Sequence, residues 1–332
     1  MKHTRLKWMI PFLLLPLLGI GIYYFVVQDN TKADKPSKQQ RIDEAIKYHN
    51  ERTKDLKLGY VPQEGLALAL EQTRALQAEY ALKKNKFDKA RFRERGPKNI
   101  AGRTRTILVD RNDPSGKSMF VGGVTGGLWK TEDITNPDPQ WRPVNDYLEN
   151  INVGCLVQSK NDPNLMYMGT GEVYGVFRGN GIYRSVDGGN NWKLMGSTSV
   201  GVAGSTFTYV QDLYLDENDR LFAATISGLY YTDDNGRSWE QLVDGTTHEI
   251  ERGGSWLYVA TNSEVYRGNI NSLQFRSVAR NSGFPRGFSR IEISVCEATP
   301  STIYLLGNQR GNASNIYASY NSGENWFMLG IP

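Results

Sequence analysis

Three stretches of the chain repeat one eight-residue phrase: SVDGGNNW at 185–192, TDDNGRSW at 232–239 and SYNSGENW at 319–326. Each phrase has a hydroxyl residue, an Asp or Asn two positions later, a glycine two positions further, and a tryptophan three after that. An Asp side chain accepts backbone N–H bonds across a tight turn, and glycine adopts backbone conformations closed to other residues. The phrase therefore predicts a recurring structural turn rather than a catalytic loop.

The phrase belongs to a longer repeat of four strands. An apolar strand, an Asn/Asp/Pro turn and a second strand recur, as in VDRNDPSGKSMFVGG from 109 and VQSKNDPNLMYMGTG from 157. A third strand leads into the phrase, and the tryptophan of the phrase begins a fourth strand. One repeat lacks a recognisable phrase and has Phe275 at the tryptophan position. Four-stranded units with a period of about 40–50 residues are typical of a β-propeller. We predict an all-β fold with five visible blades of a larger propeller, at about 103–144, 152–195, 209–242, 247–278 and 290–330.

The phrase resembles the Asp-box of sialidase-type (BNR) repeats, Ser/Thr-x-Asp-x-Gly-x-x-Trp. This resemblance implies an outer turn between the third and fourth strands of each blade, away from the channel where ligands bind, with its tryptophan packed between blades. A calcium-binding or catalytic role for Asp187 or Asp234 is the alternative. In the first blade, the hydroxyl and acidic residues lie three positions further than usual from the tryptophan. The implied structural residues are Thr131, Asp133, Trp141, Ser185, Asp187, Gly189, Trp192, Thr232, Asp234, Gly236, Trp239, Ser319, Asn321, Gly323 and Trp326.

A longer stretch, from RERGPKNIAGRTRTILVDRNDP to GNGIYRSVDGGNNW, is similar to sortilin-type and glycosyl-hydrolase-type propellers of exported bacterial surface proteins. The resemblance covers about residues 92–332. Many such proteins carry a C-terminal domain for type IX secretion. The resemblance implies a cell-surface or otherwise extracytoplasmic binding protein whose partner is a protein, a peptide or a glycan.

Two enzyme families with related propellers fit the sequence poorly. Retaining sialidases hold the substrate carboxylate with an arginine in an Arg-Ile-Pro context, whereas this chain has Arg290, Ile291 and Glu292. Xyloglucanase-type propellers carry a catalytic Asp in a stretch where this chain reads VTGGLW, with Val124 in its place. Because glycoside hydrolysis needs paired carboxylates, we predict binding without catalysis. A glycan-active hydrolase with acids elsewhere in the chain is the alternative.

Four charged residues are candidates for contact with a ligand or partner: Arg103, Arg105, Glu172 and Arg178. Glu172 ends the GTGE stretch after a second strand. For this residue, a structural hydrogen bond is a simpler interpretation than a catalytic role. Together with Arg184, these three arginines resemble the arginine patch through which photosystem II assembly-factor propellers bind a partner protein. Ordinary surface ion pairs are the alternative.

The N-terminus predicts export. Basic residues at positions 2, 5 and 7 precede an uncharged, mostly apolar run at 8–27, which is long enough to span a bilayer. Residues 1–28 are therefore either an uncleaved membrane anchor or a cleaved signal, and both place the rest outside the cytoplasm. A polar linker follows at 29–40, then a helical preface at 41–91 and the propeller at 92–332. FRERGP at 92–97 reads as a fourth strand without the first three, which suggests a longer protein with further blades.

Charge and composition exclude several other functions. Residues 31–98 carry 17 basic against 10 acidic side chains, and residues 99–332 carry 19 against 24. Because the propeller region is mildly acidic, nucleic acid is not an expected partner. Three scattered histidines give no metal-ligand spacing, so no metal or other cofactor is expected. Cys155 and Cys296 lie in apolar, strand-like runs and are expected to be unpaired thiols.

Overall fold

The computed structural model describes residues 38–60, 72–73, 75–76, 78–79, 102–145, 148–173, 177–200, 205–309 and 312–330. The chain divides into two units, residues 1–62 and 63–332, and the first contains helix α2 (Lys38–Thr53). Within the described residues, no helix is long and apolar enough to cross a membrane. The predicted anchor or signal at 1–28 and the predicted strand at 92–97 lie outside the described residues.

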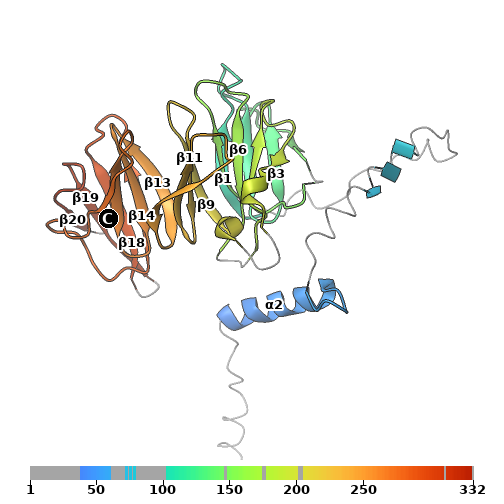
Figure 1. The fold of residues 1–332 in the computed structure, drawn as a ribbon, viewed down its shortest axis with the longest axis horizontal. Helices are drawn as coiled ribbons and strands as arrows, with labels where there is room; N and C mark the ends of the chain where they lie inside the picture. Colours follow the sequence, from blue (N-terminus) through green and yellow to red (C-terminus); the bar gives the residue numbers. More distant parts are fainter. Residues whose placement is uncertain are drawn as a thin grey trace, which may run out of the picture. The chain divides into compact units, whose positions relative to one another are not determined.

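In the described part of the second unit, between residues 102 and 330, the chain forms five antiparallel sheets of four strands, as predicted for an all-β fold (Figure 1). In each sheet the strands follow one another in chain order, and we call the sheets blades 1 to 5. Their bounds are β1 (Thr104–Val109), β2 (Met119–Gly123), β3 (Gly127–Thr131) and β4 (Trp141–Pro143); β5 (Val153–Gln158), β6 (Met166–Thr170), β7 (Ile182–Ser185) and β8 (Lys193–Leu194); β9 (Val210–Leu215), β10 (Leu221–Thr225), β11 (Gly228–Thr232) and β12 (Glu240–Asp244); β13 (Thr247–Gly253), β14 (Trp256–Thr261), β15 (Val265–Asn269) and β16 (Phe275–Ser277); β17 (Arg290–Val295), β18 (Ile303–Gln309), β19 (Asn312–Ser319) and β20 (Phe327–Gly330).

Neighbouring blades pack through their first strands. β1 contacts β5, β5 contacts β9, β9 contacts β13, and β13 contacts β17. No comparable contact joins β17 back to β1 within the described part of residues 102–330. The five blades therefore form an open series, which Figure 1 shows running from the green blades to the red one.

The hydrophobic core is divided into four clusters, each lying between two successive blades. Each cluster combines one face of a blade with the opposite face of the next. The second strand of the earlier blade contributes one large aromatic side chain to each cluster, and these side chains are fully buried: Phe120, Tyr167, Phe222 and Tyr258. Since burying an aromatic side chain contributes about 2–3 kcal/mol, contacts between blades hold the unit together.

Candidate binding site on the first strands

Two of the first strands are joined to the next by a carboxylate. Asp212 on β9 accepts a hydrogen bond from the backbone N–H of Ile250 on β13 (Oδ2 to N, 2.8 Å). Glu249 on β13 accepts one from the backbone N–H of Ile293 on β17 (Oε2 to N, 2.7 Å). Because a half-buried carboxylate loses part of its solvation by water, an N–H partner helps to stabilise it. These two acids therefore link blade 3 to blade 4 and blade 4 to blade 5.

Burial also changes the acidity of these groups. Burial raises the pKa of Asp212 to about 7, although the N–H groups of Ile250 and Leu213 oppose this. The pKa of Glu249 is raised in the same way by burial, and the nearby charges of Glu292 and Asp212 raise it further. The first strands thus hold carboxyl groups that are partly protonated near neutral pH.

A histidine, His248, directly precedes Glu249 in the chain. His248 Nε2 is 2.7 Å from Asn262 Oδ1, and His248 Nδ1 is 3.1 Å from Gln211 Oε1. Burial lowers the pKa of His248, so the ring is neutral at pH 7. Each ring nitrogen lies within hydrogen-bond distance of a side-chain amide, and the neutral ring can donate from one of the two nitrogens. Among the described residues, no group of three or more His, Cys, Asp or Glu is arranged to hold a metal ion.

The four charged residues singled out in the sequence lie near the beginning of the first strands, and three of them come together. Glu172 is almost fully buried, and its Oε2 lies 3.4 Å from Arg103 Nη2 and 3.6 Å from Arg105 Nε. The backbone carbonyl of Arg178 accepts hydrogen bonds from Asn150 and Asn152. The carboxylate of Glu172 is therefore engaged by two arginines, one of which, Arg103, is largely exposed.

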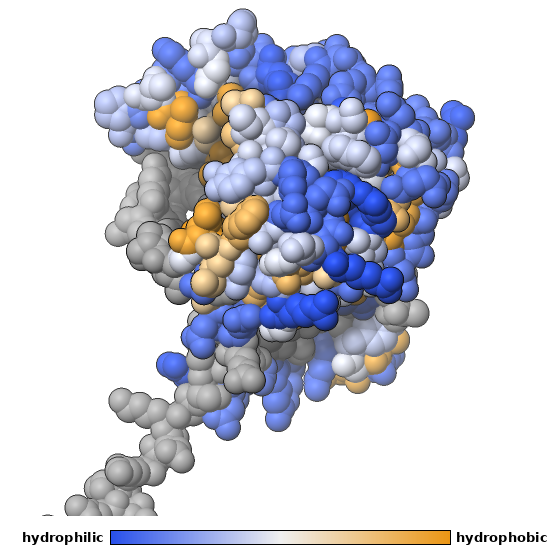
Figure 2. Space-filling model, turned by 90° about the vertical axis from the view of Figure 1, so that its left-hand side faces the viewer, coloured by the Kyte–Doolittle hydropathy of each residue, from blue (hydrophilic) through white to orange (hydrophobic). Residues whose placement is uncertain are grey.

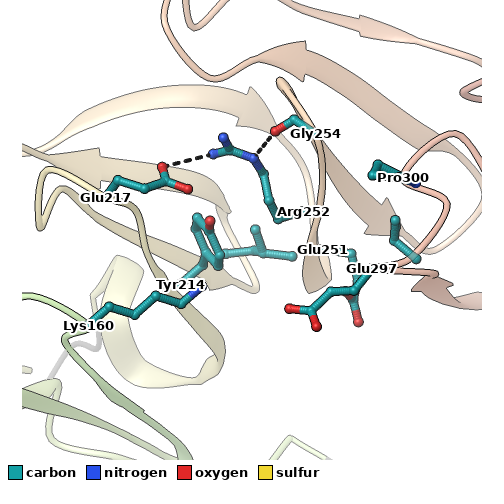
Figure 3. Close-up of a pocket in the computed structure, with 10 residues that line it drawn as sticks. Lys160, Tyr214, Glu217, Glu251, Arg252, Gly254, Glu297 and Pro300 are labelled. Carbon is teal, nitrogen blue, oxygen red and sulfur yellow. Dashed lines mark hydrogen bonds and ion pairs between the residues drawn. The ribbon is translucent and has the colours of Figure 1, made fainter.

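A cavity of about 370 Å³ opens at the other end of the first strands (Figure 3). Its charged wall includes the ion pair between Arg252 and Glu217 (Nη1 to Oε2, 3.4 Å), and Arg252 also donates to the carbonyl of Gly254. Residues from blades 2, 3, 4 and 5 contribute to it: Lys160, Tyr214, Glu217, Ile250, Glu251, Arg252, Gly254, Val295, Glu297 and Pro300. Its volume lies in the range of small-molecule binding sites.

Glu251 is the most unusual residue of this cavity. It is partly buried, and no hydrogen bond or ion pair to its carboxylate is found within the described residues. Burial, with repulsion from Asp212 and Glu297, raises its pKa to about 7. Burial and neighbouring negative charge both disfavour the ionised form of this carboxyl group.

The repeated phrases form closed turns between the third and fourth strands of their blades. In the turn at 232–239, Thr232 donates to Asp234 (Oγ1 to Oδ1, 2.7 Å) and accepts from the N–H of Gly236 (2.9 Å). Hydrogen bonds from the side chain and backbone of Ser238 lower the pKa of Asp234. The turns at 185–192 and 319–326 repeat the hydroxyl contacts with Asp187 and Gly189, and with Asn321 and Gly323.

The glycine of each phrase has a positive φ, at 82° for Gly189, 77° for Gly236 and 84° for Gly323. This conformation is strained for residues with a Cβ. Trp192, Trp239 and Trp326 pack against the clusters between their own blade and the preceding one. Thr131 of blade 1 is buried, and Asp133 accepts from the N–H and the hydroxyl of Thr135. Trp141 of blade 1 lies at the surface.

No protein-family model matches the chain, and no curated protein sequence matches it. The chain is similar in structure to the extracellular domain of BT4673 from B. thetaiotaomicron, with a TM-score of 0.50 and 16% identity over 69% of this chain and 28% of that one. It is also similar to the GH74 xyloglucanase from Xanthomonas campestris (TM-score 0.45, 13% identity, 69% of this chain and 45% of that one). A third similar structure is YCF48 bound to D1 peptide (TM-score 0.42, 12% identity, 68% and 82%).

Identities of this size are evidence for the fold alone. The five four-stranded sheets in chain order, packed through their first strands, define the chain as a β-propeller protein. The chain spans less than half the length of BT4673 and of the xyloglucanase.

Sequence reasoning missed the cavity and the row of carboxylates. Asp212, Glu249 and Glu251 stand in VQDLYL and THEIERG, where each looks like an ordinary polar position of an alternating strand. The signal that could have indicated them was position. First strands line the centre of a propeller, so acidic residues within predicted first strands are candidates for a site, as Glu172 in the GTGE stretch was.

Proposed function

We propose that this chain is an extracytoplasmic β-propeller that binds a protein, peptide or glycan at the inner face of its first strands and catalyses no reaction. The observation that carries the proposal is the cavity at the end of these strands. Residues from four blades line it, and its partly buried Glu251 carboxylate has no hydrogen-bond partner among the described residues.

The polar groups of the cavity suit a ligand that offers several donors. Glu251 and Glu297 supply acceptor oxygens, Lys160 supplies a donor, and the ring of Tyr214 offers an apolar face (Figure 3). Hydroxyl groups of a glycan, or amide and amine groups of a peptide, would satisfy these acceptors. We infer that a bound donor replaces the missing partner of Glu251, which makes this residue central to recognition.

Other parts of the chain have supporting roles in the proposal. The three phrases and their counterpart in blade 1 act as Asp-box turns that fix the blades and carry no ligand. Arg103, Arg105, Glu172 and Arg178 form a second partner-facing group, in which the exposed Arg103 is the accessible member. Residues 8–27 serve as a membrane anchor or export signal.

A glycan-active hydrolase is the second candidate, and one observation favours it. Asp212 and Glu251 each have a pKa of about 7, the value that lets a carboxyl group act as a general acid near neutral pH. Hydrolysis would require one of them to donate a proton to the leaving oxygen while a second, ionised carboxylate assists.

A binding screen tests the proposed function. Purified protein is applied to a glycan array and a peptide array, and each hit is titrated by calorimetry. The proposal expects Glu251→Gln to weaken a hit about tenfold or more, since a charge-assisted hydrogen bond is lost. The matched variant Glu240→Gln, which changes an exposed carboxylate on the outermost strand β12, should bind like the wild type. Equal affinity of Glu251→Gln and the wild type would contradict this site.

A further inference from the structure

Blades 1, 2 and 4 each place two cationic side chains opposite each other on their third and fourth strands. The pairs lie in register with the buried aromatic residue of the second strand, and they are Lys130 with Arg142, Arg184 with Lys193, and Arg267 with Arg276. Like charges directly opposite each other on neighbouring strands repel and destabilise a sheet. A carboxylate that contacts both members of a pair removes this repulsion.

In blade 4, this carboxylate comes from the repeated phrase of blade 5. Glu324 Oε1 lies 2.5 Å from Arg267 Nη2 and 2.8 Å from Arg276 Nη2, so one oxygen contacts both cations. The backbone carbonyl of Ser322, in the same turn, also accepts from Arg267. Arg276 and Glu324 reach solvent, and Figure 2 shows that hydrophilic residues cover much of the surface on the blade 5 side. A buried arginine of one blade is thus neutralised by a turn of the next blade.

In blade 1, the carboxylates come from the same blade. Glu132 Oε1 lies 2.9 Å from Arg142 Nη2 and 3.9 Å from Lys130 Nζ. Asp110 Oδ2 lies 2.8 Å from the same Nζ. The pairs of blades 1 and 4 therefore each contact a carboxylate that bridges both cations.

The positions that supply these carboxylates hold other residues around the pair of blade 2. The strand registers and the places within the repeated phrase give three correspondences: Asp110 with Ser159, Glu132 with Val186, and Glu324 with Arg237. None of the three replacements is acidic, and Arg237 brings a third positive charge.

Arg184 and Lys193 consequently have no acidic partner. Neither forms an ion pair within the described part of the chain, and Nε of Arg184 is buried without a hydrogen-bond partner. The hydroxyl of Tyr167 lies against Arg184 but carries no charge. Asp219 acts on the same hydroxyl, and its two carboxylate oxygens accept hydrogen bonds from side chains of blade 2. The repulsion that Glu324 removes in blade 4 is therefore left in blade 2.

A cavity of about 270 Å³ lies beside this pair. Arg184 and Lys193 line it together with Asn235 and Gly236 from the repeated phrase of blade 3, and none of its lining residues is acidic. Asn235 stands at the position of Ser322, and the two residues share a positive φ of 60° and 59°. The cavity therefore occupies the place between blades 2 and 3 that the Glu324 carboxylate fills between blades 4 and 5.

We propose that this cavity, which we call the Arg184 cavity, binds a small molecule that carries a carboxylate group. The carboxylate contacts Arg184 and Lys193 through charge-assisted hydrogen bonds, as Glu324 contacts its two arginines. Val186, whose side chain is exposed at the rim, offers an apolar surface to the rest of the ligand. The Arg184 cavity shares no lining residue with the cavity around Glu251, so it is independent of the proposed function.

Titration with two small acids tests the proposal. Glutarate carries its carboxylate on a short methylene chain, as Glu324 does, and galacturonate carries one on a sugar ring; glutaramide and galactose are the uncharged controls. Calorimetry in a chloride buffer of low ionic strength should show binding of at least one acid and of neither control. The acid that binds identifies the source of the carboxylate. Arg184→Gln and Lys193→Gln should each weaken binding about tenfold, whereas Arg280→Gln, at an exposed arginine of the loop after blade 4, should not.

Arg237→Glu is a second test, because it places a carboxylate at the position that Glu324 holds in blade 5. It should raise the melting temperature by a few degrees above that of Arg237→Gln and weaken the binding of the acid at least tenfold. In the ligand-free protein, Arg184→Gln should melt no lower than the wild type, since it removes a repulsion. An arginine with a purely structural role would instead lower the melting temperature when replaced.

Three results would overturn the proposal. The first is a wild-type protein that binds neither acid, and the second is binding that Arg184→Gln leaves unchanged. The third is an Arg237→Glu variant that melts like Arg237→Gln and binds the acid as tightly, because a carboxylate at this position would then not reach the cationic pair.

Discussion

Replacing Glu251 by glutamine should make the protein more stable at alkaline pH and leave it nearly unchanged in acid. Burial and the charges of Asp212 and Glu297 raise the pKa of Glu251 from the ordinary 4.5 to about 7. A carboxyl group with a raised pKa stabilises the folded state fully below its unfolded pKa, and this contribution is lost as the pH rises through the folded value. The relevant window is therefore about pH 4.5 to 7.

The size of the effect follows from the same values. The difference between 4.5 and about 7 corresponds to an upper limit of about 3 kcal/mol. Glu251 keeps some solvent access, and Asp212 titrates in the same range, so we expect about 1–2 kcal/mol. Glutamine has no charge to ionise, so the variant should escape this loss.

Urea unfolding at pH 4.5 and pH 8 measures the difference. Glu251→Gln should exceed the wild type by about 1–2 kcal/mol at pH 8 and by less than about 0.5 kcal/mol at pH 4.5. Glu240→Gln, at an exposed side chain of β12, is the matched control variant in both measurements. A Glu251→Gln variant whose stability difference does not change between the two pH values would refute the reasoning.

The remaining predictions concern the architecture of the blades. Trp326→Ala should lower the free energy of unfolding by about 3–5 kcal/mol, because its side chain is 4% exposed between blades 4 and 5. The matched change Trp141→Ala, at the exposed tryptophan of blade 1, should cost less than about 1 kcal/mol. Gly236→Ala should destabilise by about 1–3 kcal/mol, because φ is 77° and the new Cβ would overlap the side chain of Met195. Thermal melts read out all three variants, and equal losses for the two tryptophans would contradict the packing described.

The sequence was sufficient to predict the all-β class and the four-stranded units. The turn phrase, with its glycine at positive φ, leaves a local signature that recurs with the blade period. The tryptophan that ends each phrase also has a local cause, because it directly precedes a fourth strand at a fixed distance from the turn. Such features can be recognised in the sequence because each depends on residues that are close in the chain.

The candidate site could not be predicted in the same way. Asp212 and Ile250 are 38 positions apart, and Glu249 and Ile293 are 44 apart, so their hydrogen bonds depend on how successive blades pack. The cavity needs residues from four blades at once. The pairing of Arg103 and Arg105 with Glu172 also joins different blades, although all three residues were singled out for their charge.

Product analysis of bound glycans tests the central claim, binding without catalysis, most directly. Each glycan that binds is incubated for a long period with the wild type and with Asp212→Asn, and the mixture is examined by mass spectrometry. The account predicts intact glycan in both mixtures, together with binding that weakens in Glu251→Gln. Cleaved glycan from the wild type that disappears with Asp212→Asn would contradict it and establish the first strands as a hydrolase site.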